Sequence, residues 1–467
     1  MTATAATRTD QLTADLAVIG FGKAGKTLAA TLGKAGQRVV LVEQSPRMYG
    51  GTCINIGCVP TKSMVYRSEH LPAGTVHTDD YCRAIEVTDE LTSQLRAGNL
   101  AMLTTIPTVT VLTGRARFVD PHTLVVAAED GSTVRVSATH IVVGTGSEPV
   151  IPDVPGLREC AATVTSTTLL ATPGLPRRLV VLGGGYVGIE FAAMYARYGA
   201  QVTVVDHNPR ILVREDEDVA QCAAAILAQS GLTLLTGATI TRVDEAPGSS
   251  AVVHYERDGE SGCVEADLVL AALGRRPVTE DLGLAEAGVD TTARGAIAVD
   301  EHLRTSQPHI FAVGDVNGGP QFTYISLDDY RIVLDQLRGT GTRSTADRVA
   351  VPYSLFMTPP LSRVGVTERE ARASGRRVKM AVKPVAELAT MPRARIVDDP
   401  RGLMKVVVDA ETDEILGAAL LSHDSHEVIN TVALAVRHGI TASALRDAIY
   451  THPSMTEGFN QLLGALV

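Results

Sequence analysis

The sequence predicts an α/β protein with two to four domains. The chain of 467 residues is too long for one hydrophobic core, and one glycine-rich pattern occurs twice, each time between apolar segments. A composition of 45% hydrophobic residues with 42 glycines also fits a well-packed α/β protein with many tight strand-to-helix turns. We therefore expect strands and helices to alternate in at least two domains.

The first glycine pattern begins directly after the apolar run Leu16–Ile19. It contains Gly20, Gly22 and Gly25, continues as a helix to about residue 34, and is followed by a second apolar strand that ends at Glu43. The glycines allow a tight turn and let the backbone approach a pyrophosphate at the helix N-terminus, while the acid can hold a ribose diol. The pattern predicts a dinucleotide site.

A second copy of the pattern starts after the apolar run 179–182. Its glycines are Gly183, Gly185 and Gly188, and the next strand ends at Asp206. Two dinucleotide folds imply two dinucleotides, and FAD with a nicotinamide is the economical pair. Asp206 should attract the free ribose hydroxyl of NADH and repel the phosphate of NADPH, although the nearby Arg210 opposes this. We predict NADH, with NADPH still open.

Two cysteines, Cys53 and Cys58, are separated by four residues in a segment rich in small residues. If this segment opens a helix, both lie on one face, close enough for a disulfide, and the helix N-terminus stabilises a thiolate. A zinc ribbon would need a second close pair, and the other four cysteines are scattered singly. A pair of inert buried thiols remains the alternative to an active-site disulfide.

Near the C-terminus, His452 and Glu457 occur in the segment Thr-His-Pro-Ser-Met-Thr-Glu. Thiol–disulfide exchange needs a group that moves a proton near neutral pH, and a carboxylate on the far nitrogen of a histidine fixes its tautomer and basicity. A helix-capping or otherwise satisfied histidine is the alternative. Together with the cysteine pair, the segment favours an acid–base role.

The segment Gly50-Gly-Thr-Cys-x4-Cys-x2-Pro-x-Lys62 resembles the redox-active disulfide of the flavin-dependent pyridine nucleotide-disulfide oxidoreductases. The His-Pro-x3-Glu segment, the strand ending at Gly146 and the segment from Thr305 to Asp315 also match that family. The resemblance implies two Rossmann-like domains, with the NAD domain inserted in the FAD domain, and a C-terminal α+β dimerisation domain. The boundaries that we predict are a disordered leader 1–15, FAD-binding residues 16–155 and 276–345, NAD(P)H-binding residues 156–275 and an interface domain 346–467.

The resemblance also implies residue roles. Cys58 would lie against the flavin, Cys53 would face the substrate, and Lys62 would form an ion pair with Glu190 beside the flavin. The catalytic residues expected are thus Cys53, Cys58, His452, Glu457, Lys62 and Glu190. The cofactor contacts expected are Gly20, Gly22, Gly25, Glu43, Gly51, Thr52, Lys62, Gly146, Gly183, Gly185, Gly188, Asp206, Gly274, Gly314 and Asp315, with no metal ligand among them.

Within the family, the segments beginning at Gly20, Met48, Gln321 and Phe356 look like the bacterial reactive-chlorine-resistance flavoprotein group. That group is associated with reducing hypothiocyanous acid and with copper, so we expect a small oxidant as substrate. The tail ending at Val467 lacks the C-terminal cysteine pair of mercuric reductases and large thioredoxin reductases. A dihydrolipoamide dehydrogenase-like enzyme, a mercuric- or copper-ion reductase-like enzyme and a flavin redox sensor remain alternatives.

The charge balance argues against several partners. The net charge is −10, no long basic run occurs, and no apolar run reaches the roughly 18 residues of a membrane span. We therefore expect a cytoplasmic homodimer that binds neither nucleic acid nor membrane. His423 and His426 leave copper binding open, although such a cluster is more often a polar helix start capped by Asp424 or Ser425.

Overall fold

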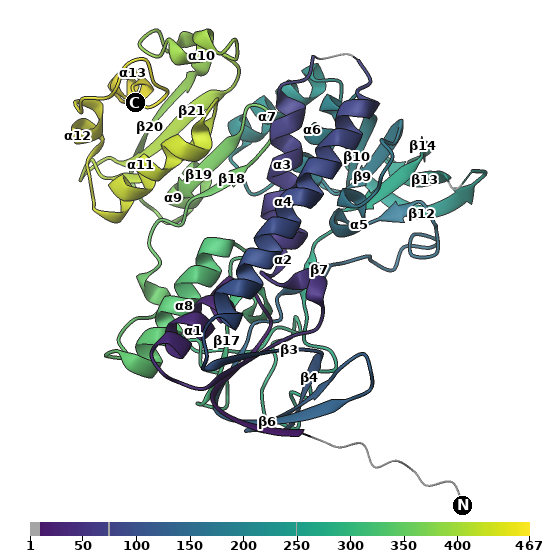
Figure 1. The fold of residues 1–467 in the computed structure, drawn as a ribbon. Helices are drawn as coiled ribbons and strands as arrows, with labels where there is room; N and C mark the ends of the chain where they lie inside the picture. The colour runs from purple at the N-terminus through teal and green to yellow at the C-terminus, as the bar shows by residue number, and fades with distance from the viewer. Residues whose placement is uncertain (1–9, 73–74, 249) are drawn as a thin grey trace, which may run out of the picture. The chain divides into compact units, whose positions relative to one another are not determined.

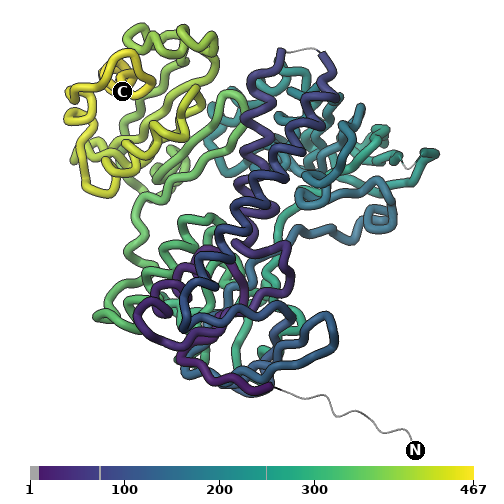
Figure 2. Tube along the Cα trace, in the orientation of Figure 1, coloured from purple at the N-terminus to yellow at the C-terminus, as the bar shows by residue number. Residues whose placement is uncertain are grey.

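The structure is a computed structural model that describes residues 10–72, 75–248 and 250–467. The chain divides into two compact units: unit 1 has residues 1–63, 85–150 and 274–347, and unit 2 has residues 64–84, 151–273 and 348–467. The chain, traced in Figure 2, thus leaves unit 1 after Val150 and returns to it at Gly274. Unit 2 thus contains most of the residues predicted to bind NAD(P)H together with most of those predicted for the interface domain. The predicted boundaries of the domains stay predictions.

Unit 1 is built on a seven-stranded sheet in the order β3-β2-β1-β6-β5-β4, with β17 paired to β6. Figure 1 labels β3, β4, β6 and β17 of this sheet. The pairs among β1, β2, β3, β6 and β17 are parallel, whereas β4, β5 and β6 pair antiparallel. The strands are β1 Asp10–Ile19, β2 Val39–Glu43, β3 Val109–Thr113, β4 Arg115–Asp120, β5 Thr123–Ala127, β6 Thr133–Val143 and β17 Ile310–Ala312. A two-stranded sheet joins β7 Ser147–Pro149 to β16 Arg275–Pro277.

The side chains of β1 alternate between two cores, as a strand buried on both faces requires. Leu16 and Val18 pack in the cluster that includes Leu28 of α1 and Ile332 of α8. Ala17 and Ile19 face the opposite cluster, beneath β4 and β5. The helices that lie wholly or partly in unit 1 are α1 Lys23–Lys34, α2 Thr52–Asn55, α3 Cys58–Glu69, α4 Thr78–Thr104 and α8 Thr323–Arg338. This unit also has 3₁₀ turns at Pro46–Met48, Gly314–Asn317 and Thr345–Asp347.

The prediction of a disordered leader is wrong for residues 10–15, which belong to β1. Residues from Asp10 to Ala14 pair with residues from Val134 to Ala138 of β6. This pairing satisfies the backbone groups of a polar segment that has no apolar run of its own. The rest of the predicted leader, residues 1–9, lies outside the described residues.

Unit 2 contains a five-stranded parallel sheet in the order β11-β10-β9-β15-β8. Its elements are β8 Thr163–Val164, α5 Ser166–Leu170, β9 Arg178–Leu182, α6 Tyr186–Arg197, β10 Gln201–Asp206, α7 Glu217–Gln229, β11 Thr233–Thr236 and β15 Leu268–Ala271. An antiparallel sheet of β12 Ala238–Ala246, β13 Ser250–Arg257 and β14 Glu260–Ala266 is attached to it. The second glycine pattern therefore has the strand–turn–helix–strand setting that the sequence predicts.

The C-terminal part of unit 2 is an antiparallel sheet in the order β18-β19-β22-β21-β20, with α11 packed on β19 and β22. Its strands are β18 Tyr353–Leu355, β19 Leu361–Gly365, β20 Val378–Pro384, β21 Leu403–Asp409 and β22 Ile415–Leu421. Its helices are α9 Glu368–Ala373, α10 Arg393–Ile396, α11 Ser425–Arg437, α12 Ala442–Arg446 and α13 Gly458–Leu462, with 3₁₀ turns at Val385–Glu387 and Leu463–Ala465. Within the described ranges, no helix has the length and apolarity needed to cross a bilayer.

Candidate active site

The first fingerprint has space where a pyrophosphate is expected. Gly20 has φ +101°, and a Cβ there would lie 2.3 Å from the Gly144 carbonyl oxygen, so only glycine fits this turn. A Cβ at Gly25 would lie 2.9 Å from the Gly20 oxygen, because helix and strand pack closely. A Cβ at Gly22 would meet nothing nearer than 3.7 Å. In a dinucleotide fingerprint, the first glycine allows the tight turn, the second lets the backbone approach the pyrophosphate, and the third allows close packing of helix and strand. Gly20, Gly22 and Gly25 fit these three roles in that order.

The second fingerprint repeats this pattern. Gly183 has φ +105°, a Cβ at Gly188 would lie 2.0 Å from the Gly183 oxygen, and a Cβ at Gly185 would meet nothing within 4 Å. The acids at the ends of the two fingerprints, Glu43 and Asp206, also accept equivalent hydrogen bonds from the backbone. Phe21 N donates to Glu43 Oε2 at 3.0 Å, and Gly184 N donates to Asp206 Oδ2, each across 22 positions.

The residues expected to hold the flavin lie together in unit 1. A Cβ at Gly51 would lie 2.7 Å from Gly22 Cα, and one at Gly146 would lie 3.9 Å from Thr52 Oγ1. The absence of a side chain at Gly51 therefore lets the cysteine segment approach the backbone of the fingerprint turn closely, whereas the Cβ position of Gly146 has room. The residues present therefore fit a dinucleotide lying along this surface.

The returning segment brings Asp315 to the same region. Ser147 Oγ donates to Asp315 Oδ2 at 2.6 Å, and the guanidinium of Arg275 donates to Ser147 Oγ at 2.8 Å. Gly314 has φ +71°, and its N–H donates to Asp329 Oδ2 at 2.6 Å. Gly274, at the start of this return, has φ +118° and open space around its Cβ position. Ser147 orients the carboxylate that the sequence predicts for the ribityl chain.

The cysteines lie in two consecutive helices rather than in one helix opening. Cys53 belongs to the short α2, and Cys58 is the first residue of α3. The Gly57 carbonyl between them accepts from Thr61 N at 3.1 Å and from Thr61 Oγ1 at 2.7 Å, so a new helix begins there. Both cysteines are free thiols whose side chains hydrogen-bond to each other, so they lie close together although the backbone between them is not one continuous helix.

The two thiols differ in acidity because of their partners. The hydrogen bond from Cys53, the Thr323 hydroxyl at 3.5 Å and the positive charge of Lys62 lower the pKa of Cys58 to about 6. The hydrogen bond to Cys58 and burial raise the pKa of Cys53. Cys58 therefore carries the thiolate, and Cys53 donates to it.

His452 and Glu457 form the predicted dyad in unit 2. The Nδ1 of His452 donates to Glu457 Oε2 at 2.8 Å, because a carboxylate can only accept, and Ser454 N donates to Oε1 at 2.8 Å. The His452 side chain is 67% exposed, whereas that of Glu457 is 12% exposed. The buried acid thus fixes the tautomer of the exposed ring and leaves Nε2 outside this hydrogen bond.

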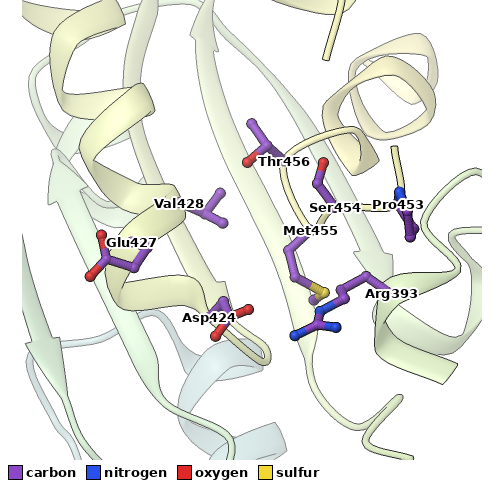
Figure 3. A pocket seen from close by; sticks show the side chains of 8 residues that line it. All are labelled: Arg393, Asp424, Glu427, Val428, Pro453, Ser454, Met455 and Thr456. Atoms are coloured by element: carbon purple, nitrogen blue, oxygen red, sulfur yellow. The ribbon is translucent and has the colours of Figure 1, made fainter. Parts of the chain in front are cut away.

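A pocket of about 360 Å³ adjoins this loop (Figure 3). Pro453, Ser454, Met455 and Thr456 line one side, and Arg393 extends into it from the segment of α10. Asp424, Glu427 and Val428 line the part near the start of α11. The loop after His452 is therefore packed on its own domain while its histidine points outward.

Comparison with known proteins agrees with this geometry. A family model described as pyridine nucleotide-disulphide oxidoreductase matches residues 14–329, and the dimerisation domain of the same family matches residues 351–463. The chain belongs to this family. It is an FAD- and NAD(P)H-dependent enzyme, as the sequence predicts, with the predicted α/β architecture.

Three comparisons, which involve two similar proteins, refine the assignment. The chain is 46% identical over 445 residues to the probable pyridine nucleotide-disulfide oxidoreductase RclA of Escherichia coli K12, covering 95% of this chain and 97% of that protein. A solved Cu(II) complex of the HOCl-induced flavoprotein disulfide reductase RclA from the same species has a TM-score of 0.91 at 45% identity and covers 97% of this chain and 99% of that one. Mercuric reductase of Staphylococcus aureus is 34% identical and covers 95% of this chain and 81% of that protein. The enzyme is thus a flavoprotein disulfide reductase of the RclA type.

Not every predicted contact lies within one unit of this flavoprotein disulfide reductase. Lys62 and the cysteines lie in unit 1, whereas Glu190 and His452 lie in unit 2. Glu190 is 8% exposed, and its Oε1 accepts from Phe356 N at 2.9 Å. The Lys62–Glu190 ion pair and the assignment of individual site residues therefore stay predictions.

The histidine cluster differs from the expected helix start. Asp424 occupies the N-cap of α11 with φ +52° and makes no side-chain cap bond, while Ser425 Oγ donates to the Pro360 carbonyl at 2.7 Å. The predicted capping by either residue is wrong. Asp424 makes no side-chain hydrogen bond to the start of the helix, and the hydroxyl of Ser425 bonds to Pro360 instead. Over the described ranges, no group of three or more His, Cys, Asp or Glu side chains suits a metal ion.

Two residues of the reductase site were missed by sequence reasoning. Thr323 contacts Cys58 across 265 positions, and no local pattern marks it. Lys26 is buried beside the cysteine segment, and its position within helix α1 could have indicated its burial from the sequence. It shares the i, i+3, i+4, i+7 stripe of α1 with Ala29, Ala30 and Gly33, where a charge is unusual.

The acidity of Cys58 leads to a pH prediction. We expect the rate of iodoacetamide alkylation of Cys58 in the reduced reductase to rise with a midpoint near pH 6, because the thiolate persists above that pH and is protonated below it. Since the pKa is lowered on folding, any stability from the thiolate is present above the ordinary thiol range and is lost as pH falls through about 6. Mass spectrometry would assign the alkylated cysteine, and Thr323→Ala should move the midpoint upward. A midpoint near that of an ordinary thiol would contradict this picture.

Proposed function

We propose that this reductase passes two electrons from NADH, through FAD and the Cys53–Cys58 pair, to a small sulfur oxidant such as hypothiocyanous acid. The supporting observation is the pair of free, mutually hydrogen-bonded thiols with a thiolate favoured at Cys58. A small oxidant needs only one reactive thiolate and little binding pocket. The similarity to a protein described as HOCl-induced supports an oxidant of this class.

The proposed route oxidises the two thiols to a disulfide in two steps. Cys53 gives its proton to His452 and attacks the sulfur of hypothiocyanous acid. A Cys53–S–SCN bond forms, the S–O bond breaks, and the hydroxide leaves as water after taking that proton back from His452. The Cys58 thiolate then attacks the Cys53 sulfur, so that the disulfide forms and thiocyanate leaves. The two thiols are oxidised by two electrons, and the oxidant is reduced by two. FAD, when bound, supplies the transfer of an electron pair from NADH to the disulfide.

The residues of the chain have separate tasks in this scheme. Thr323 and Lys62 stabilise the thiolate on Cys58, which is thereby a good leaving and resolving group. The Glu457 carboxylate keeps a proton on His452 Nδ1, so Nε2 performs the proton transfer. The two glycine fingerprints and Asp315 are proposed to position the two dinucleotides.

We propose that the working form is a cytoplasmic homodimer in which His452 of each subunit serves the cysteines of its partner subunit. The match to a dimerisation domain and the exposure of His452 support this arrangement. A reducing compartment fits a cysteine pair that is regenerated by nicotinamide. Copper remains a candidate ligand or substrate, because the similar E. coli protein was solved as a Cu(II) complex.

An anaerobic NADH titration tests the function. Reduced enzyme should develop the long-wavelength absorbance band of a thiolate lying against oxidised flavin, and hypothiocyanous acid should discharge that band in stopped flow faster than lipoamide or glutathione disulfide. Faster discharge by lipoamide would favour the dihydrolipoamide dehydrogenase alternative. Bleaching of the flavin without such a band would contradict the dithiol route, and a single turnover without repetition would favour a redox sensor.

We predict a preference for NADH over NADPH. Asp206 is 7% exposed at the end of β10, and Arg210 donates to the carbonyls of Leu212, Val213 and Glu215 in its own loop, at 3.3, 3.4 and 3.1 Å. Repulsion of the extra phosphate by Asp206, with Arg210 already engaged, should favour NADH by roughly tenfold or more in kcat/KM. Asp206→Ala should bring the kcat/KM values for NADH and NADPH closer together. Higher kcat/KM with NADPH in the unmodified enzyme would refute the preference.

A further inference from the structure

A buried lysine lies beside the cysteine segment and has no task in the scheme above. Lys26 of α1 is 6% exposed, and its Nζ donates to Asn99 Oδ1 at 2.5 Å and to the Gly50 carbonyl at 3.2 Å. Burying an ammonium is costly, so lysines in this position are rare unless their charge is used or paired. Both of these hydrogen-bond partners are neutral oxygens, so neither supplies a carboxylate that would account for the burial.

The backbone that Lys26 contacts leads directly to the attacking thiol. Gly50 precedes Cys53 by three residues, and the turn between them is held from a second side by Asn55. Asn55 Nδ2 donates to the Tyr49 and Gly51 carbonyls at 3.1 and 2.9 Å, and Arg96 Nε donates to Asn55 Oδ1 at 2.8 Å. Helices α1 and α4 thus fix the cysteine turn through polar side chains.

We propose that Lys26 is a positioning residue whose ammonium holds the Gly50 carbonyl and places a buried positive charge beside the Cys53 turn, favouring the Cys53 thiolate that attacks the oxidant. The inference rests on the proposed function, in which Cys53 is the attacking thiol. A positive charge in a poorly hydrated site acts on a nearby thiolate more strongly than a surface charge does. The hydrogen bonds keep this charge in place without neutralising it.

Two neighbouring charges act on Cys53 in opposite directions: the negative charge of Cys58 raises the pKa of Cys53, whereas the positive charge of Lys26 lowers it. Burial lowers the pKa of Lys26 to about 8, and Lys23 contributes to the lowering, whereas a negative charge on Cys53 raises it. Lys26 is therefore cationic near pH 7 and loses its proton as the pH rises through about 8. The other groups that act on the two thiols are Lys62 of α3 and the hydroxyl of Thr323 of α8, while Arg96 of α4 contacts Asn55.

Three variants separate the charge from the hydrogen bonds. Lys26→Met removes both, Asn99→Ala removes one hydrogen bond and keeps the charge, and Lys26→Arg keeps the charge with altered bonding. The measurement is the pH profile of iodoacetamide alkylation of Cys53 in the reduced holoenzyme, with the cysteine assigned by mass spectrometry. In parallel, stopped flow records NADH-driven flavin reduction.

We expect Lys26→Met to lower the alkylation rate of Cys53 at pH 7 about tenfold, as a rise of about one pKa unit would. Flavin reduction by NADH should stay unchanged, and Asn99→Ala and Lys26→Arg should remain within about threefold of the unmodified enzyme. Equal losses in Asn99→Ala and Lys26→Met would overturn the inference, because the hydrogen bonds alone would then explain the effect. Loss of FAD from Lys26→Met would also overturn it and assign Lys26 to cofactor retention.

If Lys26→Met does not fold, the other two variants still decide. Loss of Cys53 reactivity in both, with the charge kept, would contradict an electrostatic role. The proposed function fails separately: it requires coupling of the dithiol to the flavin in the unmodified enzyme. Unchanged Cys53 reactivity in Lys26→Met with that coupling intact removes only the inference about Lys26.

Discussion

Replacing Cys58 by serine is expected to leave FAD bound and to lower kcat for oxidant reduction by at least roughly 10³-fold. The hydroxyl of serine stays protonated at neutral pH, so it cannot resolve the adduct on Cys53 or carry the thiolate that Thr323 and Lys62 stabilise. Steady-state NADH oxidation with hypothiocyanous acid measures the loss. The flavin spectrum of the same sample shows whether the cofactor is retained.

A matched control is Cys263→Ser, which changes an exposed, isolated cysteine of β14. This variant should keep full activity and the thiolate–flavin band. The Cys58→Ser variant should lose the band as well as turnover, because the thiolate that forms it is absent. Unchanged turnover in Cys58→Ser would exclude the dithiol route.

Replacing His452 by glutamine should lower kcat by roughly 10²–10⁴-fold, the usual contribution of a general acid–base group. Glutamine keeps a donor near Glu457 but cannot exchange a proton near neutral pH. The pH–rate profile should lose the limb that belongs to the histidine, while NADH-driven flavin reduction continues. A kcat within twofold of the unmodified enzyme would contradict a proton-transfer role.

Hybrid dimers test whether the histidine acts across subunits. If each site combines the cysteines of one subunit with the histidine of the other, a dimer of one Cys58→Ser chain and one His452→Gln chain contains one intact site and one doubly altered site. Two nearly inactive parents would then give a hybrid with about half of the activity of the unmodified dimer. An inactive hybrid, purified with two different affinity tags, would show that each site is built within one chain.

The reliable sequence predictions concern features set by near neighbours in the chain. Each glycine fingerprint and its terminal acid span a single strand–turn–helix–strand unit, so their geometry follows from short-range backbone requirements. The bond between His452 and Glu457 joins residues five positions apart. Residue types and spacing alone therefore indicate the two dinucleotide folds and the acid–base pair.

Predictions that depended on distant partners were incomplete or wrong. Residues 10–15 are a strand because β6, more than 100 positions away, pairs with them. Asp424 lies at the N-cap position but in a left-handed conformation without a cap bond, which its residue type does not reveal. The helix expected around the cysteines is interrupted at Gly57. The carbonyl of Gly57 accepts the hydrogen bonds from Thr61 in the first turn of α3.

By itself, the sequence determined the α/β class, the two dinucleotide fingerprints, the cysteine pair and the histidine–carboxylate dyad, because each depends on residue types at short and fixed spacing. Only the tertiary structure decided which cysteine carries the thiolate and which side chains support it. Thr323 reaches Cys58 across 265 positions, and Lys26 reaches Asn99 across 73. The physical reason is that the acidity of a thiol depends on the burial, charges and hydrogen-bond donors around it, and folding brings these together from separate parts of the chain.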